Sequence, residues 1–178
     1  MTTGPDAGEE LRRRLNRELE LILPGARLEQ VCLETVPDLK LWLLNPDYPQ
    51  GELHPEQVQR VMSNPLYWVF CWASGQVLAD FLLREPNWVR GRRVMDFGCG
   101  SGVVAIAAAM AGAQEVIACD IDPLALQATQ LNAELNGVEL TITDDYFNVD
   151  GHLDMVIVAD VLYDRGNLPW LSRFSGRS

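Results

Sequence analysis

The sequence has few of the residues that metal-binding and membrane-spanning proteins need. It contains four cysteines and two histidines in 178 residues, and none of them forms the closely spaced pairs of a zinc site. We therefore expect no metal site and reduced, buried thiols. No apolar run reaches the ~18 residues that cross a bilayer, and no secretion signal opens the chain. These absences favour a cytoplasmic protein with no membrane partner.

Basic residues are also scarce. Lys and Arg number 14 against 25 Asp and Glu, for a net charge of −11. An acidic surface repels the phosphates of nucleic acid and of anionic lipids. We expect no nucleic-acid partner, and the same field favours a protein partner that presents lysine.

Apolar spacing predicts an N-terminal extension over residues 1–63, helical with one possible short strand. Leucines and isoleucine recur at helical intervals from Glu9 to Leu23. A short strand is expected near Leu39 to Leu44. A second helix is expected over His54 to Met62, ended by Asn64-Pro65 because the residue before a proline avoids helical geometry.

Residues 64–178 predict an α/β domain with a Rossmann-like parallel sheet. After a buried helix that carries Trp68, Trp72, Val77, Leu78, Phe81 and Leu82, strands and helices alternate along the chain. The strands are expected near residues 93–97, 115–119, 140–143 and 155–158, and the helices near 103–111 and 123–135. Right-handed crossovers and a return past the first strand predict the order 3-2-1-4, with helices on both faces.

The turn after the first of these strands is rich in glycine. Gly98, Gly100 and Gly102 stand between a strand and a helix, where positive φ angles and free helix amides suit a polar ligand. Asp96 precedes them. Its carboxylate would repel a pyrophosphate but suits a ligand with an ammonium group. The turn therefore favours S-adenosylmethionine over a dinucleotide.

Further acids follow the second and third strands. Asp120 stands where a Rossmann acid binds ribose hydroxyls, and we assign it to the ribose. Asp122 precedes Pro123 and is expected to cap the next helix. Asp145 is a candidate for the adenine amine, with an ordinary turn acid as the alternative.

Three segments together resemble the class I S-adenosylmethionine-dependent methyltransferases: VMDFGCGSG, ACDIDP and ADVLYD. The last is similar to the motif after the fourth strand in protein-lysine methyltransferases. PLYWVFCWASGQVLADFLL and VPDLKLWLLNP resemble segments of the electron-transfer-flavoprotein β-subunit lysine methyltransferases and their bacterial relatives. The resemblance implies methyl transfer to a protein lysine, with the electron-transfer-flavoprotein β subunit as a possible substrate.

The resemblance also implies roles for individual residues. Asp160 and Tyr163 would be the catalytic acid and aromatic, and Trp68 and Trp72 are candidates for substrate-pocket walls, with core packing as the alternative. The predicted cofactor-binding set is Asp96, Gly98, Cys99, Gly100, Gly102, Asp120, Ile121, Asp145 and Ala159.

The chain departs from the family at its C-terminus, where no apolar run remains for the strands that usually follow the fourth. We expect a C-terminally truncated sheet whose fourth strand is an uncovered edge. A small-molecule methyltransferase, a ribosomal-protein methyltransferase and an inactive cofactor-binding fragment are the alternatives.

Overall fold

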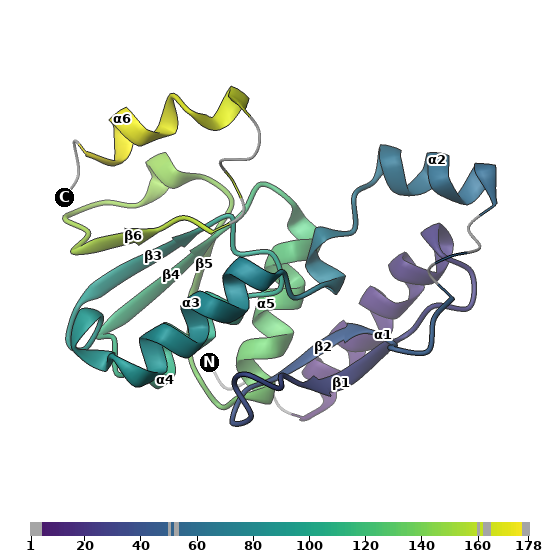
Figure 1. Ribbon diagram of the computed structural model, residues 1–178, viewed down its shortest axis with the longest axis horizontal. Coiled ribbons are helices and arrows are strands. Elements are labelled where there is room, and N and C mark those ends of the chain that lie inside the picture. The colour runs from purple at the N-terminus through teal and green to yellow at the C-terminus, as the bar shows by residue number, and fades with distance from the viewer. Residues whose placement is uncertain (1–4, 50, 52–53, 160, 162–164, 176–178) are drawn as a thin grey trace.

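The computed structural model describes residues 5–49, 51, 54–159, 161 and 165–175 (Figure 1). The N-terminal elements are α1 (Pro5–Ile22), β1 (Leu28–Cys32), β2 (Lys40–Leu44) and α2 (Pro55–Ser63). They are followed by α3 (Ala73–Arg84), β3 (Arg93–Phe97), α4 (Val103–Met110), β4 (Glu115–Cys119), α5 (Pro123–Leu135), β5 (Thr141–Thr143), β6 (Met155–Ile157) and α6 (Trp170–Phe174). Single 3₁₀ turns form η1 (Tyr67–Val69), η2 (Pro86–Trp88), η3 (Tyr146–Asn148) and η4 (Arg165–Asn167). No described helix is both long and apolar enough to cross a membrane.

The main sheet has four parallel strands in the order β5-β4-β3-β6. This confirms the predicted order 3-2-1-4 and the predicted α/β fold. Asp96 on β3 lies beside Ala118 on β4 and Ile157 on β6. The carboxyl ends of the central strands therefore meet at one edge of the sheet, where such folds bind ligands.

Helices lie on both faces of the sheet, as predicted. Figure 1 shows α3 and α4 on one side and α6 on the other. Val94 and Val116 point into an aliphatic core with α4, while Met95 and Ile117 point into a second core with aromatic residues of η3 and α6. The alternation follows from the two-residue period of a strand.

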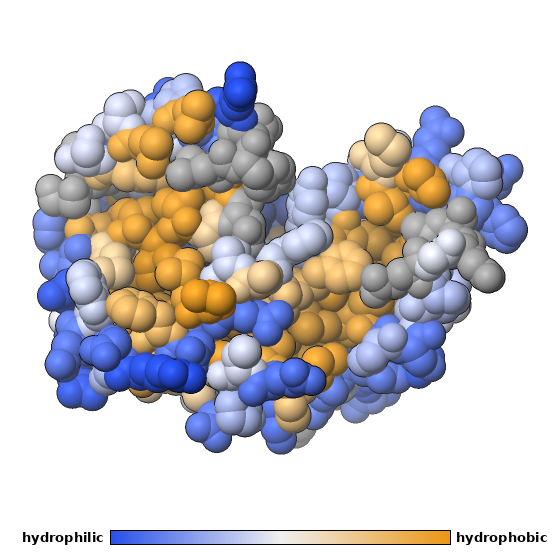
Figure 2. Space-filling model, viewed as in Figure 1, coloured by the Kyte–Doolittle hydropathy of each residue, from blue (hydrophilic) through white to orange (hydrophobic). Residues whose placement is uncertain are grey.

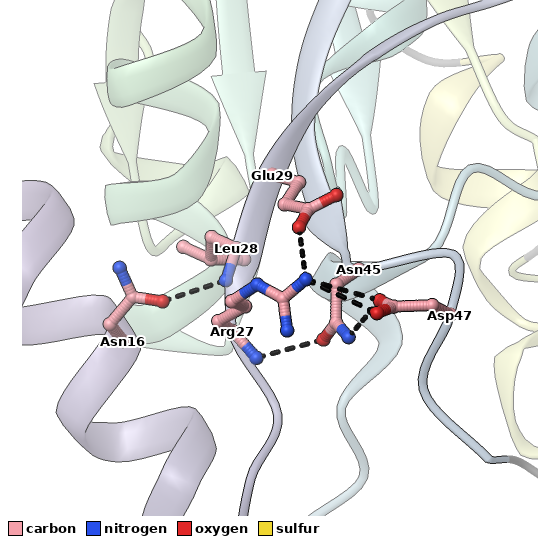
Figure 3. Close-up of polar contacts among 6 residues, drawn as sticks. All are labelled: Asn16, Arg27, Leu28, Glu29, Asn45 and Asp47. Atoms are coloured by element: carbon pink, nitrogen blue, oxygen red, sulfur yellow. Dashed lines mark hydrogen bonds and ion pairs between the residues drawn. The ribbon is translucent and has the colours of Figure 1, made fainter.

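A separate antiparallel hairpin, β1 and β2, packs with α1 beside the sheet. Asn16 of α1 accepts a hydrogen bond from the Leu28 amide at 2.7 Å, and the Arg27 guanidinium pairs with Glu29 and Asp47 (Figure 3). The Asn16 bond fastens α1 to the start of the hairpin, and the Arg27–Asp47 pair joins the start of the hairpin to the segment after β2.

The hairpin is joined to the sheet unit through α5. The amide of Trp42 donates to Asn132 Oδ1 at 2.7 Å, and Asn136 exchanges two hydrogen bonds with the backbone of Lys40. An asparagine on α5 and the C-cap asparagine that follows the helix thus satisfy backbone groups of β2.

Helix α3 is shorter than predicted and buries a different face. It begins at Ala73, because Trp72 has an extended backbone and Trp68 lies in the 3₁₀ turn η1. Gly75, Ala79 and Leu82 are its buried residues, whereas Val77 and Phe81 are exposed. Of the large residues that we expected on the buried face, Leu82 is buried and Leu78 packs partly on the core, while the small residue Gly75 makes the close contact with α4.

Candidate functional site

The glycine turn after β3 has the backbone that its sequence predicts. Gly98, Gly100 and Gly102 have φ angles of +77°, +54° and +85°, a region that other residues rarely adopt. A Cβ atom on Gly98 would overlap the Val161 side chain, and one on Gly102 would lie 2.9 Å from Thr129. The turn is therefore packed closely on both sides, and only glycine fits at these two positions.

Side chains of α5 hold the turn from behind. Thr129 Oγ1 donates to the Gly100 carbonyl at 3.1 Å and lies 3.3 Å from Cys99 Sγ. Asn132, fully buried, donates from Nδ2 to the Ser101 carbonyl at 2.8 Å. Because Asn132 also binds β2, one side chain ties the hairpin to the turn.

Asp96 is a buried acid beneath the start of α4. Its Oδ2 accepts the Ala105 amide at 3.1 Å, one of the helix amides without an intrahelical partner. Burial raises its pKa to about 7, the nearby Asp120 charge adds to the rise, and the Ala105 hydrogen bond opposes it. A cation placed beside this carboxyl would stabilise its ionised form.

Asp120 follows β4 and faces the glycine turn. Its carboxylate accepts the Gly100 amide at 2.9 Å and the Asp122 amide at 3.0 Å. Burial raises the pKa of Asp120, and these backbone hydrogen bonds lower it. Asp122 itself accepts the Leu124 amide at 2.9 Å and caps α5, as predicted.

A cavity of about 600 Å³ opens at this edge of the sheet, a size that suits a cofactor or drug-sized ligand. The predicted site residues that line it are Asp96, Gly98, Cys99, Gly100, Asp120, Ile121, Ala159 and Trp72. Ile121 is 90% exposed and leaves an apolar side chain in solvent at the cavity. The cavity thus has two acidic side chains, a glycine backbone that a ligand can approach closely, and apolar walls.

Three predicted residues lie away from the cavity wall. Gly102 is the N-cap of α4 and packs on Thr129. Asp145 accepts the Phe147 amide at 2.8 Å and caps η3, which is the turn role left open above. Trp68 is fully buried in the core that joins α1, the hairpin and α5, so its prediction as a pocket wall is corrected to core packing.

The two predicted catalytic residues, Asp160 and Tyr163, lie outside the described residues. Their described neighbours Ala159 and Val161 both line the cavity. The catalytic roles of Asp160 and Tyr163 stay predictions.

Several cavity residues were missed from the sequence. Tyr67 lies across from Trp72 at a ring distance of 6.3 Å, and Asn167 and Trp170 enter from the segment after β6. Those residues belong to a 3₁₀ turn or to a five-residue helix, where no periodic pattern marks a buried side. Asn132 had a usable signal, because an asparagine on the apolar face of a helix needs a partner.

The chemistry of the cavity favours one class of ligand. Carboxylates accept hydrogen bonds from hydroxyls and attract cations, and they disfavour phosphates. Among the described residues, no group of three or more His, Cys, Asp or Glu side chains could hold a metal ion. The residues therefore suit a ligand that carries hydroxyl groups and a positive charge better than one that carries a phosphate.

Known proteins with similar sequences are methyltransferases. The family model for ribosomal protein L11 methyltransferase matches residues 82–165. The electron transfer flavoprotein beta subunit lysine methyltransferases of Mus musculus and Rattus norvegicus are 34% and 38% identical over 92% of this chain. The chain spans 61% of the length of each of these relatives.

A solved structure is also similar. The crystal structure of the ribosomal protein L11 methylase from Lactobacillus delbrueckii subsp. bulgaricus matches with a TM-score of 0.51 and 31% identity. The match covers 61% of this chain and 56% of that one. The fold and the resemblance predicted from the sequence motifs are confirmed.

Proposed function

Because this chain is related to the class I S-adenosylmethionine-dependent methyltransferases, we propose that it binds S-adenosylmethionine in the cavity and methylates a lysine side chain of a protein. The observation that carries the proposal is the pairing of Asp96 and Asp120 around the glycine turn at the carboxyl ends of β3 and β4. Among the described residues, Asp96 is the one acid that is buried, and Asp120 beside it is partly buried next to the same glycine turn.

Each acid has a different task in this proposal. Asp120 binds the ribose hydroxyls, and Asp96 stabilises the ammonium of the methionine portion through its ionised form. Gly100 leaves room for the ligand, because a Cβ atom there would meet no protein atom within 4 Å. Ile121 covers an apolar face of the ligand.

S-adenosylmethionine supplies a methyl group on a sulfonium, which a nucleophile takes by in-line displacement. The lysine amine must be neutral to attack, and lowering its pKa from about 10.4 to 7 corresponds to roughly 4.6 kcal/mol. Trp72 contributes an apolar wall that disfavours the charged amine by desolvation. Asp160 is the proposed residue that orients the substrate ammonium before its proton leaves, and Tyr163 is proposed as an aromatic wall of the site.

The cofactor assignment is tested by calorimetric titration with S-adenosylhomocysteine. We expect Asp120→Ala to weaken binding by about 1.5–3 kcal/mol, the scale of hydrogen bonds to a charged group. Asp122→Ala is the matched control, because Asp122 caps α5 and does not line the cavity. Equal affinity in the parent and Asp120→Ala, or tighter binding of NAD, would refute the assignment.

The reaction is tested with labelled S-adenosylmethionine and two purified proteins, the electron-transfer-flavoprotein β subunit and ribosomal protein L11. We expect label on lysine of the flavoprotein subunit, and loss of transfer in Asp160→Asn and Tyr163→Phe with S-adenosylhomocysteine affinity unchanged. The family model and the solved L11 methylase favour L11 as the second candidate substrate. Cofactor binding without transfer to either protein would refute both of these substrates and favour a small-molecule methyltransferase or an inactive cofactor-binding fragment.

A further inference from the structure

Helix α2 carries an apolar face that the other described residues leave exposed. None of its nine residues, all of which are described, is buried. Val58 and Met62 lie four residues apart and so share one side of the helix, and they are 40% and 77% exposed. Val61 packs partly on the core beside α1, which fixes the helix to the body.

The segment that follows α2 in the chain brings exposed aromatic residues to the cavity. Tyr67 and Trp72 are each about half exposed, at 49% and 47%, and both line the cavity. Phe70 packs against Trp72 with ring centroids 5.6 Å apart, and Trp72 Nε1 donates to the Tyr67 carbonyl at 3.3 Å. Figure 2 shows apolar side chains over α2 and in the hollow below it.

The aromatic part of this surface is held at a fixed place relative to the glycine turn. Trp72 is the N-cap of α3, and Gly75 in the first turn of α3 lies against α4. A Cβ atom on Gly75 would lie 2.9 Å from Val103 Cγ1, so the two helices are as close as glycine allows. Helix α4 begins directly after the glycine turn. The close contact between α4 and α3 therefore fixes the position of Trp72, the N-cap of α3, relative to that turn.

We propose that Val58, Met62, Tyr67 and Trp72 form the docking surface for a folded protein substrate, which lays an apolar patch on α2 and passes a lysine across Trp72 into the cavity. The proposal rests on the proposed function and names where its protein substrate binds. We call these four residues the docking surface.

Three observations favour a protein as the occupant. Val58 and Met62 do not line the cavity, so a small molecule contained in it leaves them in water. The net charge of −11 disfavours nucleic acid and anionic lipid, and it attracts a protein that presents lysine. Exposed aromatic side chains with a methionine are the residue types enriched in protein interfaces, and a Trp face binds an ammonium favourably.

Binding to the immobilised electron-transfer-flavoprotein β subunit, with L11 in parallel, tests the surface without relying on turnover. We expect the double variant Val58→Ser, Met62→Ser to bind about tenfold more weakly, as for loss of central apolar contacts. Val77→Ser, Met110→Ser is the matched control, because it removes two exposed apolar side chains from α3 and α4 that neither belong to the docking surface nor line the cavity. Its affinity should equal that of the parent.

Further measurements separate the possible failures. The α2 variant should keep its S-adenosylhomocysteine affinity, and methyl transfer should show a raised KM with kcat unchanged. Equal loss in both double variants, unchanged binding in the α2 variant, or no binding of either protein by the parent would overturn the docking surface. A dimer that only the α2 variant disrupts, seen by sedimentation, would assign the face to a second copy and overturn it too. Binding without methyl transfer would instead refute the proposed function and leave the docking surface standing.

Discussion

The two faces of the main sheet are covered in different ways. One face carries α4 and α5 over a core of valine, isoleucine, leucine and alanine. The other carries an aromatic group, in which Phe97 lies 5.0 Å from both Trp170 and Phe174 by ring centroids. Arg173 adds a cation over the Trp170 ring at 4.9 Å. Helices α4 and α5 cover one face of the sheet, and aromatic side chains from short segments cover the other.

This difference decides how firmly each face is held. Helices α4 and α5 are bounded by strands on both sides in the sequence, so they cannot leave the sheet without breaking it. Helix α6 has five residues and follows the last described strand. We expect so short a helix to open locally at a cost below that of global unfolding. The cavity is lined from both faces, by Val103 and Val104 of α4 and by Trp170 of α6.

The largest expected effect comes from removing one core side chain on each face. Ile106→Ala on α4 should lower the free energy of unfolding by about 3–4 kcal/mol, as for a fully buried large-to-small change. Phe174→Ala should cost about 1–2 kcal/mol, below the usual range for phenylalanine, because α6 can detach instead of retaining a cavity. Urea unfolding of both variants measures the difference. Equal costs would show that α6 is held as firmly as α4.

The same contrast explains what the sequence could predict. Helix α5 was predicted with its observed bounds, Pro123–Leu135, because a cap, a proline at the first position and a long apolar period agree. Strands β3 and β4 were predicted for similar reasons, as buried runs beside the glycine turn. Local propensity and the tertiary fold favour the same structure in these segments.

The aromatic face could not be predicted in that way. Segments η3 and α6 are three and five residues long, and such lengths show no period that separates buried from exposed positions. Trp68 and Trp72 were placed on one helix by their spacing, but the backbone between them is a 3₁₀ turn and an extended residue. Their different environments, core and cavity, arise from tertiary packing that spacing alone does not encode.

Asn132 of α5 is a buried polar residue that hydrogen-bonds both the hairpin and the glycine turn. Asn132→Ala should lower stability by about 2–3 kcal/mol, because the Trp42 amide and the Ser101 carbonyl both lose their partner inside the protein. It should also weaken S-adenosylhomocysteine binding, since Ser101 belongs to the glycine turn. Asn136→Ala is the control, because its bonds to Lys40 are exposed and do not touch the turn. If both variants lost the same affinity for S-adenosylhomocysteine, the hydrogen bonds of Asn132 would not be what holds the glycine turn in place.

Asp96 is buried beneath the start of α4, and its titration should make the free energy of unfolding depend on pH. Its pKa is raised from 3.8 to about 7 by burial, so between these values the folded chain binds more protons than the unfolded chain. The free energy of unfolding should therefore fall as pH rises from 5 to 6.5, by about 1.4 kcal/mol per unit from this group. Asp96→Asn retains an oxygen for the Ala105 amide and should remove this slope in urea titrations. An unchanged slope would show that another group titrates.

The smallest expected change in stability lies on the aromatic side of the cavity. Asn167 donates from Nδ2 to the Val161 carbonyl at 2.9 Å, and it links the turn before α6 to the segment after β6. Asn167→Ala should cost less than about 1 kcal/mol, because both residues are only partly buried and water can replace the amide. The effect on binding should be larger than the effect on stability, since Val161 packs against Gly98 and loosening it moves a wall of the cavity. Asn148→Ala serves as the control, being an asparagine in η3 on the same face that does not line the cavity. Calorimetric titration with S-adenosylhomocysteine and urea unfolding on the same samples measure the change in affinity and the change in stability.

If Asn167→Ala leaves the affinity unchanged, the cavity wall after β6 is held by its apolar contacts alone. The hydrogen bond from Asn167 to Val161 then has no part in shaping the cavity.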